Sequence, residues 1–258
     1  MASHTIFSIF SFLLGLALGS FANVCIYRLP LGKSIVSPPS SCPHCGSQIR
    51  FYDNIPVLSY IFLKGKCRQC KAPISLQYPI VELIVGILSL ALFTRYGVSY
   101  QYILYLIFTG SLVIITFIDL HHKVIPDIIS LPGIIIGFLA SFLLPYPTWL
   151  DSAIGIVAGG GALLLIAVIF EKVTGKEGMG GGDIKLLAMI GAWMGWKALP
   201  FVVLISSILG IIIGGGALVA SGKGMRVKIP FGPFLAMGSL IYFFFGSSIV
   251  GWYASLFV

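Results

Sequence analysis

The sequence has few charged side chains. Asp, Glu, Lys and Arg make up 9% of its 258 residues, whereas 58% of the residues are hydrophobic. A soluble domain of average composition is about one quarter charged, so this composition excludes an ordinary soluble protein. It predicts an integral membrane protein, in which the number of apolar helices that cross the bilayer decides the architecture.

Acidic residues are especially scarce, with eight carboxylates against sixteen basic side chains and a net charge of +8. An acid at a membrane boundary is costly to desolvate and is by default a candidate for function. Asp119 ends the apolar run 112–118, and Asp183 follows a glycine run that includes Gly180 and Gly182. Glycine permits close backbone approach and positive φ. The two carboxylates therefore predict one shared site, that of an aspartyl protease.

The apolar segments recur regularly and predict an all-α fold, a polytopic membrane helical bundle. The first segment lacks a basic n-region and a convincing cleavage site, so we expect it to be retained as a span. The expected spans number eight and approach the roughly 20 residues that a bilayer requires. They lie at about residues 6–27, 79–95, 101–119, 127–145, 152–170, 184–197, 199–220 and 233–253.

One long polar region interrupts this pattern, and it divides the chain into three expected parts. Residues 1–28 form the first transmembrane helix, residues 29–78 form a cytosolic zinc-binding loop, and residues 79–258 form a transmembrane aspartyl peptidase domain. The loop is the only sizeable polar region in the sequence. We therefore expect it to contribute to any binding site for a soluble cofactor.

The distribution of basic residues predicts the orientation of the chain. Arg28 and the six basic residues of the following loop would share one side of the membrane with seven later ones, whereas Arg95 and Lys197 would lie on the other side. Lys and Arg accumulate on the cytoplasmic side, so the loop and both carboxylates should face the cytosol, with both termini outside. This explains the positive charge through orientation and contact with membrane lipid, without a nucleic-acid partner. The seven later residues are Lys123, Lys172, Lys176, Lys185, Lys223, Arg226 and Lys228.

Four cysteines of the loop form two C-x2-C pairs, Cys42 with Cys45 and Cys67 with Cys70. Four thiolates from two such pairs can complete a tetrahedral zinc site, and an all-cysteine site is structural. A cytosolic location argues against disulfides. A loop with little apolar mass would also need a metal to keep its shape. We expect zinc, with a redox pair or unlinked thiols as the alternatives.

Two further acidic residues have open roles. Asp127 follows a proline at the start of a predicted helix, where an acid suits the helix dipole; a structural role and a contact with substrate remain equal alternatives. Glu82 opens the second predicted span on the cytosolic side. It either supports the start of that helix or lies near substrate or cofactor.

Several motifs occur together in one order and spacing, and with them the sequence resembles the bacterial type IV prepilin peptidases, membrane aspartyl proteases of the Gly-x-Gly-Asp type. The resemblance covers nearly the whole chain. Besides the cysteine pairs it includes Gly19-Ser-Phe-Ala-Asn-Val-Cys-Ile-Tyr-Arg-Leu-Pro30, Tyr78-Pro-Ile-Val-Glu-Leu83, Asp119-x5-Ile125-Pro126-Asp127, Gly180-Gly-Gly-Asp183 and Pro230-Phe-Gly-Pro-Phe234.

This resemblance implies that Asp119 and Asp183 are the catalytic pair. It further implies two activities on type IV prepilins and pseudopilins at the bacterial inner membrane: cleavage of a basic leader after a glycine, and methylation of the new N-terminal amine with S-adenosylmethionine. The loop is the expected methyltransferase region, with unknown binding residues. Three alternatives stay open: a presenilin or signal-peptide-peptidase type of intramembrane protease, an ion-coupled transporter, and a zinc-loop scaffold for a secretion assembly.

Overall fold

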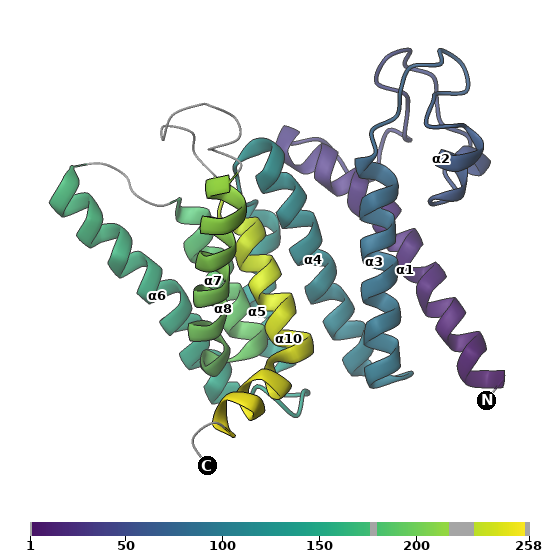
Figure 1. Cartoon of the computed structure of the whole chain (residues 1–258). Coiled ribbons are helices and arrows are strands. Elements are labelled where there is room, and N and C mark those ends of the chain that lie inside the picture. The colour runs from purple at the N-terminus through teal and green to yellow at the C-terminus, as the bar shows by residue number, and fades with distance from the viewer. Residues whose placement is uncertain (1, 176–179, 217–229, 256–258) are drawn as a thin grey trace. The chain divides into compact units, whose positions relative to one another are not determined.

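The computed structural model describes residues 2–175, 180–216 and 230–255, and nearly all of their regular structure is helical (Figure 1). Within these ranges no β-strand forms, although two isolated bridges join Ser41 to Gln48 and Lys66 to Pro73. The elements in chain order are α1 (Ala2–Arg28), η1 (Leu29–Leu31), η2 (Phe51–Asp53), α2 (Leu58–Phe62), α3 (Gln77–Tyr96), α4 (Tyr100–His122), α5 (Asp127–Ala140), α6 (Trp149–Thr174), α7 (Gly181–Met194), η3 (Trp196–Ala198), α8 (Leu199–Leu209), the π-helical η4 (Gly210–Gly215) and α10 (Gly232–Ala254).

A helix lies in each of the eight predicted spans, which confirms the all-helical membrane fold. Among the residues that the structure describes, five segments are long and apolar enough to cross a membrane, namely those containing α1, α3, α4, α6 and the run from η3 to η4. The apolar helix α5 and the stretch 232–246 are shorter. The predicted span 199–220 ends beyond the described residues, and Lys176, Gly178, Lys223, Arg226 and Lys228 also lie outside them.

The contacts divide the chain into two compact units, residues 1–114 and 115–258. The first unit contains α1, the cysteine loop, α3 and most of α4. The second contains the end of α4 and all later helices. The division falls inside α4, so the predicted separation of a loop domain from a peptidase domain at residue 79 stays a prediction.

Helix α7 is the core element of the second unit, where it contacts α5, α6, α8 and α10. Every residue from Leu186 to Met194 is buried. Trp193 is 2% exposed, and its indole Nε1 donates to the carbonyl oxygen of Gly133 on α5 at 2.8 Å. Such enclosure explains how the stretch from Leu186 to Met194 can be apolar on all sides.

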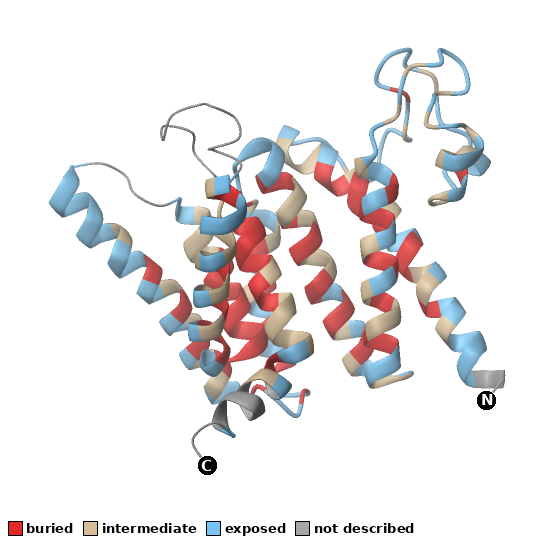
Figure 2. Cartoon of the chain, in the orientation of Figure 1, coloured by how far each residue is buried: buried red, intermediate tan, exposed pale blue. Residues whose placement is uncertain are grey.

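Glycines bring α6 close to α7. A methyl group built on Gly159 would lie 2.6 Å from the carbonyl oxygen of Leu187, and one on Gly155 would collide with the backbone of Gly191. Gly155 and Gly159 thus form a Gly-x3-Gly motif that permits this close approach of the two helices. The C-terminal half of α6 is largely exposed, as Figure 2 shows. Such exposure is expected of an apolar helix that faces lipid.

In the first unit, glycines likewise bring α1 close to α3. A methyl group on Gly15 would lie 2.5 Å from Ser89 Cβ, and one on Gly19 would lie 2.6 Å from the Cα of Glu82. The Ser89 hydroxyl donates to the carbonyl oxygen of Ser11 at 2.6 Å and lies 2.7 Å from the hydroxyl of Tyr102 on α4. These contacts fix the three helices of this unit together.

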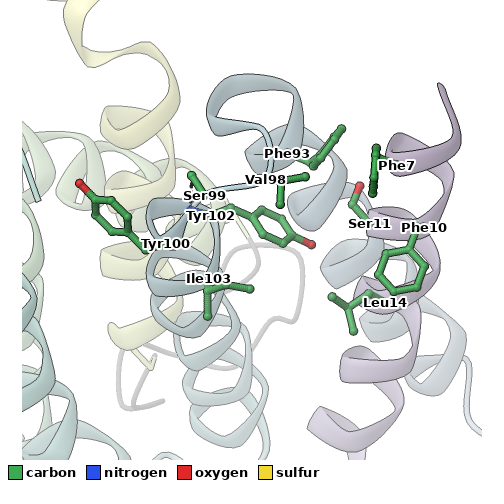
Figure 3. A pocket seen from close by; sticks show the side chains of 10 residues that line it. All are labelled: Phe7, Phe10, Ser11, Leu14, Phe93, Val98, Ser99, Tyr100, Tyr102 and Ile103. Atoms are coloured by element: carbon green, nitrogen blue, oxygen red, sulfur yellow. Dashed lines mark hydrogen bonds between the residues drawn. The ribbon is translucent and has the colours of Figure 1, made fainter. Parts of the chain in front are cut away.

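An apolar recess of about 510 Å³ lies between α1, α3 and α4 within the first unit. Figure 3 shows Phe7, Phe10 and Leu14 lining it from α1, and Tyr102 extending toward them from α4. No charged side chain lines this recess. It therefore offers a surface for hydrocarbon rather than a site for chemistry.

Candidate active site and metal centre

Asp119 lies in the last turn of α4 and is 4% exposed. Its Oδ2 accepts a hydrogen bond from the backbone N–H of Gly232 at 3.0 Å, across 113 residues of sequence. A methyl group on Gly232 would lie 2.7 Å from the same oxygen. Because residue 232 is glycine, no side chain obstructs the hydrogen bond between the Asp119 carboxylate and the backbone N–H at the start of α10.

Asp183 lies in the first turn of α7 and is partly buried. Its backbone N–H donates to the carbonyl oxygen of Gly180, the residue that precedes the helix, at 3.1 Å. The side chain is near enough to Asp119 for the two carboxylates to interact electrostatically. The fold thus brings together the two scarce acids that the sequence singled out, although 64 residues separate them.

The glycine run before Asp183 acts through close contact, because none of its residues from 180 to 182 has a positive φ. A methyl group on Gly182 would lie 2.9 Å from Cβ of Ile125, and one on Gly232 would lie 3.2 Å from the Cδ1 of the same isoleucine. Ile125 is itself buried. The two glycines therefore let α7 and α10 close around the segment that follows α4, beside both aspartates.

Asp127 and Lys185 form an ion pair next to this pair of acids. The Lys185 Nζ lies 2.7 and 2.8 Å from the two carboxylate oxygens of Asp127. Asp127 begins α5 and makes no side-chain capping bond, and more than half of its side chain is exposed. It therefore joins the start of α5 to the first turn of α7, and the ion pair engages Lys185 with Asp127 rather than with Asp183.

Each cysteine pair lies on a tight turn closed by backbone hydrogen bonds. The N–H of Cys42 donates to Ser47 O at 2.9 Å, and the N–H of Cys67 donates to Ala72 O at 2.9 Å. The residue after each second cysteine has a positive φ, 71° at Gly46 and 61° at Lys71. The two turns are thus near copies of one another, each presenting two sulfurs.

The four sulfurs of Cys42, Cys45, Cys67 and Cys70 lie within 4.8 Å of one another and could hold a metal ion. The Sγ atoms of Cys42 and Cys70 are 3.8 Å apart. Tetrahedral zinc with Zn–S bonds of about 2.3 Å requires sulfurs about 3.8 Å apart. The donor set therefore fits a closed zinc site.

The environment of Cys45 favours the thiolate that a metal requires. The side-chain hydroxyl of Ser47 lies 2.9 Å from its sulfur, and hydrogen bonds from this hydroxyl and from the Ser47 backbone lower the pKa of Cys45 to about 6. Hydrogen bonds from the backbone of Cys70 and Gln69 also lower the pKa of Cys67. Both shifts favour the thiolate form that binds a cation.

Two residues, one beside Asp119 and one in a cavity next to the cysteine loop, were not predicted from the sequence. Gly232 is one, because a backbone N–H donor has no side-chain signature; its place in the Pro-Phe-Gly-Pro-Phe motif is the only signal. Asn23 of α1 is the other, a buried amide in the first span. Glu82 was singled out, and it is buried at 7% exposure in the second turn of α3.

Comparison with known proteins agrees with this arrangement. Residues 13–96 match the family model described as Bacterial Peptidase A24 N-terminal domain, and residues 106–215 match the Type IV leader peptidase family. A prepilin leader peptidase/N-methyltransferase of Aeromonas hydrophila is 40% identical over 96% of this chain and 93% of its own length. A protein of the same name from Pseudomonas putida is 39% identical over 92% of this chain and 90% of its own length. No solved structure matches. The chain therefore belongs to the family of prepilin leader peptidases/N-methyltransferases.

Proposed function

We propose that this protein removes the leader peptide of type IV prepilins and pseudopilins after a glycine, and then methylates the new N-terminal residue. The observation that carries the proposal is the pairing of Asp119 with Asp183 at the ends of two helices, in a chain of this family. Neither a presenilin-like protease nor a transporter is favoured, since both matching family models describe A24 or type IV leader peptidases.

Two neighbouring carboxylates suit peptide hydrolysis because they do not easily ionise together. The ionised member takes a proton from water, whose oxygen attacks the scissile carbonyl carbon, while the protonated member donates to the carbonyl oxygen. Collapse of this tetrahedral species breaks the C–N bond while the aspartate that took the proton from water donates it to the leaving nitrogen, which releases the new amine. The pair titrates as a unit, so neither role is assigned to one aspartate. The N–H of Gly232 holds the Asp119 carboxylate in place.

The cysteine loop would hold zinc as a structural ion through its four thiolates, which leaves no open coordination position. S-adenosylmethionine would supply an electrophilic methyl group bound to a sulfonium. A cavity of about 850 Å³ next to the cysteine loop has the size of a small-molecule site. Its lining combines tyrosine rings with polar groups, including the Oδ1 of Asn23, which has no hydrogen-bond partner within the protein. This combination fits S-adenosylmethionine as the methyl donor.

We further propose that the protein lies in the bacterial inner membrane, with the cysteine loop and both aspartates facing the cytosol. The concentration of basic residues in the first loop and near the two aspartates supports this orientation. Prepilin leaders would then meet the site on the side where they are synthesised.

Replacing either aspartate by asparagine tests the peptidase assignment. Asp119→Asn and Asp183→Asn each replace one carboxyl group of the pair by an amide of similar volume that cannot exchange a proton. Leader cleavage should therefore fall by about a hundred- to ten-thousandfold. The measurement is the mass of a prepilin incubated with each purified variant. Glu171→Gln, which removes an exposed carboxylate of α6, is the matched control and should cleave normally. Full processing by either aspartate variant would contradict the aspartyl mechanism.

A further inference from the structure

The cavity beside the cysteine loop is built entirely within the first unit. Its walls come from the cytosolic ends of α1 and α3 and from the loop between them. Tyr27, Tyr60 and Tyr78 contribute aromatic surface, while Asn23 and Glu82 contribute polar groups from the two helices. A cavity of about 850 Å³ lined by both aromatic and polar side chains has the properties of a ligand site.

Glu82 is a buried carboxylate with spare capacity to accept hydrogen bonds. Its Oε2 accepts from the backbone N–H of Val57 at 2.7 Å, and the side chain of Ser20 also bonds to it. A carboxylate offers about four acceptor positions. In the described part of the chain it has no ion pair. A buried carboxylate is costly to ionise without a partner of opposite charge, so a cationic ligand would favour the charged form of Glu82 at this position.

The lysine and the three arginines that line the same cavity have other contacts. The Lys33 ammonium lies over the ring of Tyr27, 5.7 Å from its centroid. Arg68 is bound to Asp53 at 2.6 Å. Arg28 donates to the carbonyl oxygens of Ser34 and Pro38 at 2.9 and 2.7 Å. Arg50 bonds instead to the hydroxyl of Tyr52. These arginines are engaged within the loop.

Asn23 provides a second acceptor with no partner. Its Nδ2 donates to the carbonyl oxygens of Gly19 at 3.3 Å and Tyr78 at 3.0 Å. These two carbonyls fix the orientation of the amide, because the reversed amide would place oxygen against oxygen. The remaining Oδ1 is buried and unpartnered, on a residue that is 3% exposed. Such an atom is unfavourable unless a donor completes it.

The two acceptors lie on facing helices. Gly19, one turn before Asn23 on α1, touches Glu82, and Tyr78, bonded to Asn23, lies one turn before Glu82 on α3. Successive turns are about 5.4 Å apart, so one ligand can reach both groups. An ammonium has three N–H donors and a positive charge, which matches an amide oxygen next to a carboxylate.

We propose that Glu82 and the Asn23 Oδ1 bind a protonated amine in this cavity and so position the methyl-transfer reaction. The inference rests on the proposed function. Two participants carry such a group: the amino-acid part of S-adenosylmethionine, and the new N-terminus of the cleaved substrate, which must pass a proton to a base such as Glu82 before its neutral amine can attack the methyl group. The chemistry of recognition is the same for both, and binding measurements distinguish them.

Glu82→Gln tests the proposal in the full-length protein. The amide oxygen can still accept from Val57, so the charge is removed while the contact with the loop is kept. The substrate is a synthetic pilin peptide that is already cleaved, with a free N-terminus, together with S-adenosylmethionine. The kcat/KM of methylation should fall by about ten- to a hundredfold, the effect of losing a charged hydrogen bond. Glu82→Asp, which retains the charge, should recover part of the activity.

The source of the amine follows from two further measurements. If the amine belongs to the methyl donor, Glu82→Gln will weaken binding of S-adenosylhomocysteine in a calorimetric titration. If it belongs to the substrate, that binding will be unchanged and the KM for the free-amine peptide will rise. Either result supports the proposal.

Three results would overturn it. One is wild-type methylation by Glu82→Gln, and another is a loss confined to kcat. The third is a proportional loss of methylation, leader cleavage and zinc content, which would assign Glu82 a purely structural role. Absence of methylation by the wild-type protein is a different result, because it would remove the proposed methyltransferase function and this inference with it.

Discussion

At the residue scale, the hydroxyl of Ser47 lies 2.9 Å from the sulfur of Cys45, one of the four candidate metal ligands. Its hydrogen bond to Cys45 stabilises the thiolate and is the largest cause of a pKa of about 6. In Ser47→Ala the pKa should rise toward the ordinary cysteine value of about 8.5, so zinc must displace a proton at neutral pH. Zinc affinity should fall on the order of tenfold near pH 6.5 and much less near pH 9.

Competition with a chromophoric chelator at the two pH values measures this effect. Ser41→Ala is the matched control, since it removes a hydroxyl beside Cys42 for which the described chain shows no bond to sulfur. A variant with all four loop cysteines changed to serine should retain no zinc at either pH. Zinc retained by that variant would refute the assignment of the metal site.

The residues that could be predicted are those whose side chains are unusual for their surroundings. Asp119 and Asp183 are two of only eight acids in an apolar chain, and the cysteine spacing predicts the metal cluster directly. Gly232 and Asn23 could not be predicted in the same way. Their roles depend on Asp119, 113 residues before Gly232, and on Tyr78, 55 residues after Asn23, and only the fold brings these partners together.

At the element scale, the close approach of α6 to α7 depends on glycines, which have no side chain at the point where the helices cross. Gly159→Ala would insert a methyl group against the backbone of Leu187 and should destabilise the protein by about 1–3 kcal/mol. Gly161→Ala, two residues further along α6, meets no atom within 4 Å and is the matched control. Thermal unfolding in detergent measures both variants. Equal melting temperatures for them would contradict tight packing at this crossing.

The spans could be predicted from apolar runs, whereas their ends could not be predicted as well. Helix α7 ends at Met194, earlier than the predicted residue 197, because Gly195 adopts a φ of 74°. Such a glycine is a common helix terminator. Helix α5 ends at Ala140, although the apolar sequence continues to residue 144. Hydrophobicity alone does not reveal these stops. An apolar side chain is compatible with lipid both within a helix and after its end, provided that the backbone groups are hydrogen-bonded.

At the scale of the whole molecule, the two sets of functional groups belong to different units. The cysteine cluster, the cavity and Glu82 lie in residues 1–114, whereas Asp119, Asp183 and Gly232 lie in residues 115–258. Each set is held mainly by contacts within its own unit. We therefore propose that cleavage and methylation use different side chains of one chain.

The two proposed activities should therefore be separable by mutation. Asp119→Asn and Asp183→Asn should stop leader cleavage and still methylate a pilin that is already cleaved, because neither side chain lines the cavity beside the loop. Cys67→Ser should impair methylation more than cleavage, because it weakens the metal cluster that shapes the cavity wall. Product masses distinguish unprocessed, cleaved and cleaved-and-methylated species for each variant. If every loop variant lost both activities in strict proportion, the two reactions would have to share one cavity, and the division of functional groups between the units would describe only the fold.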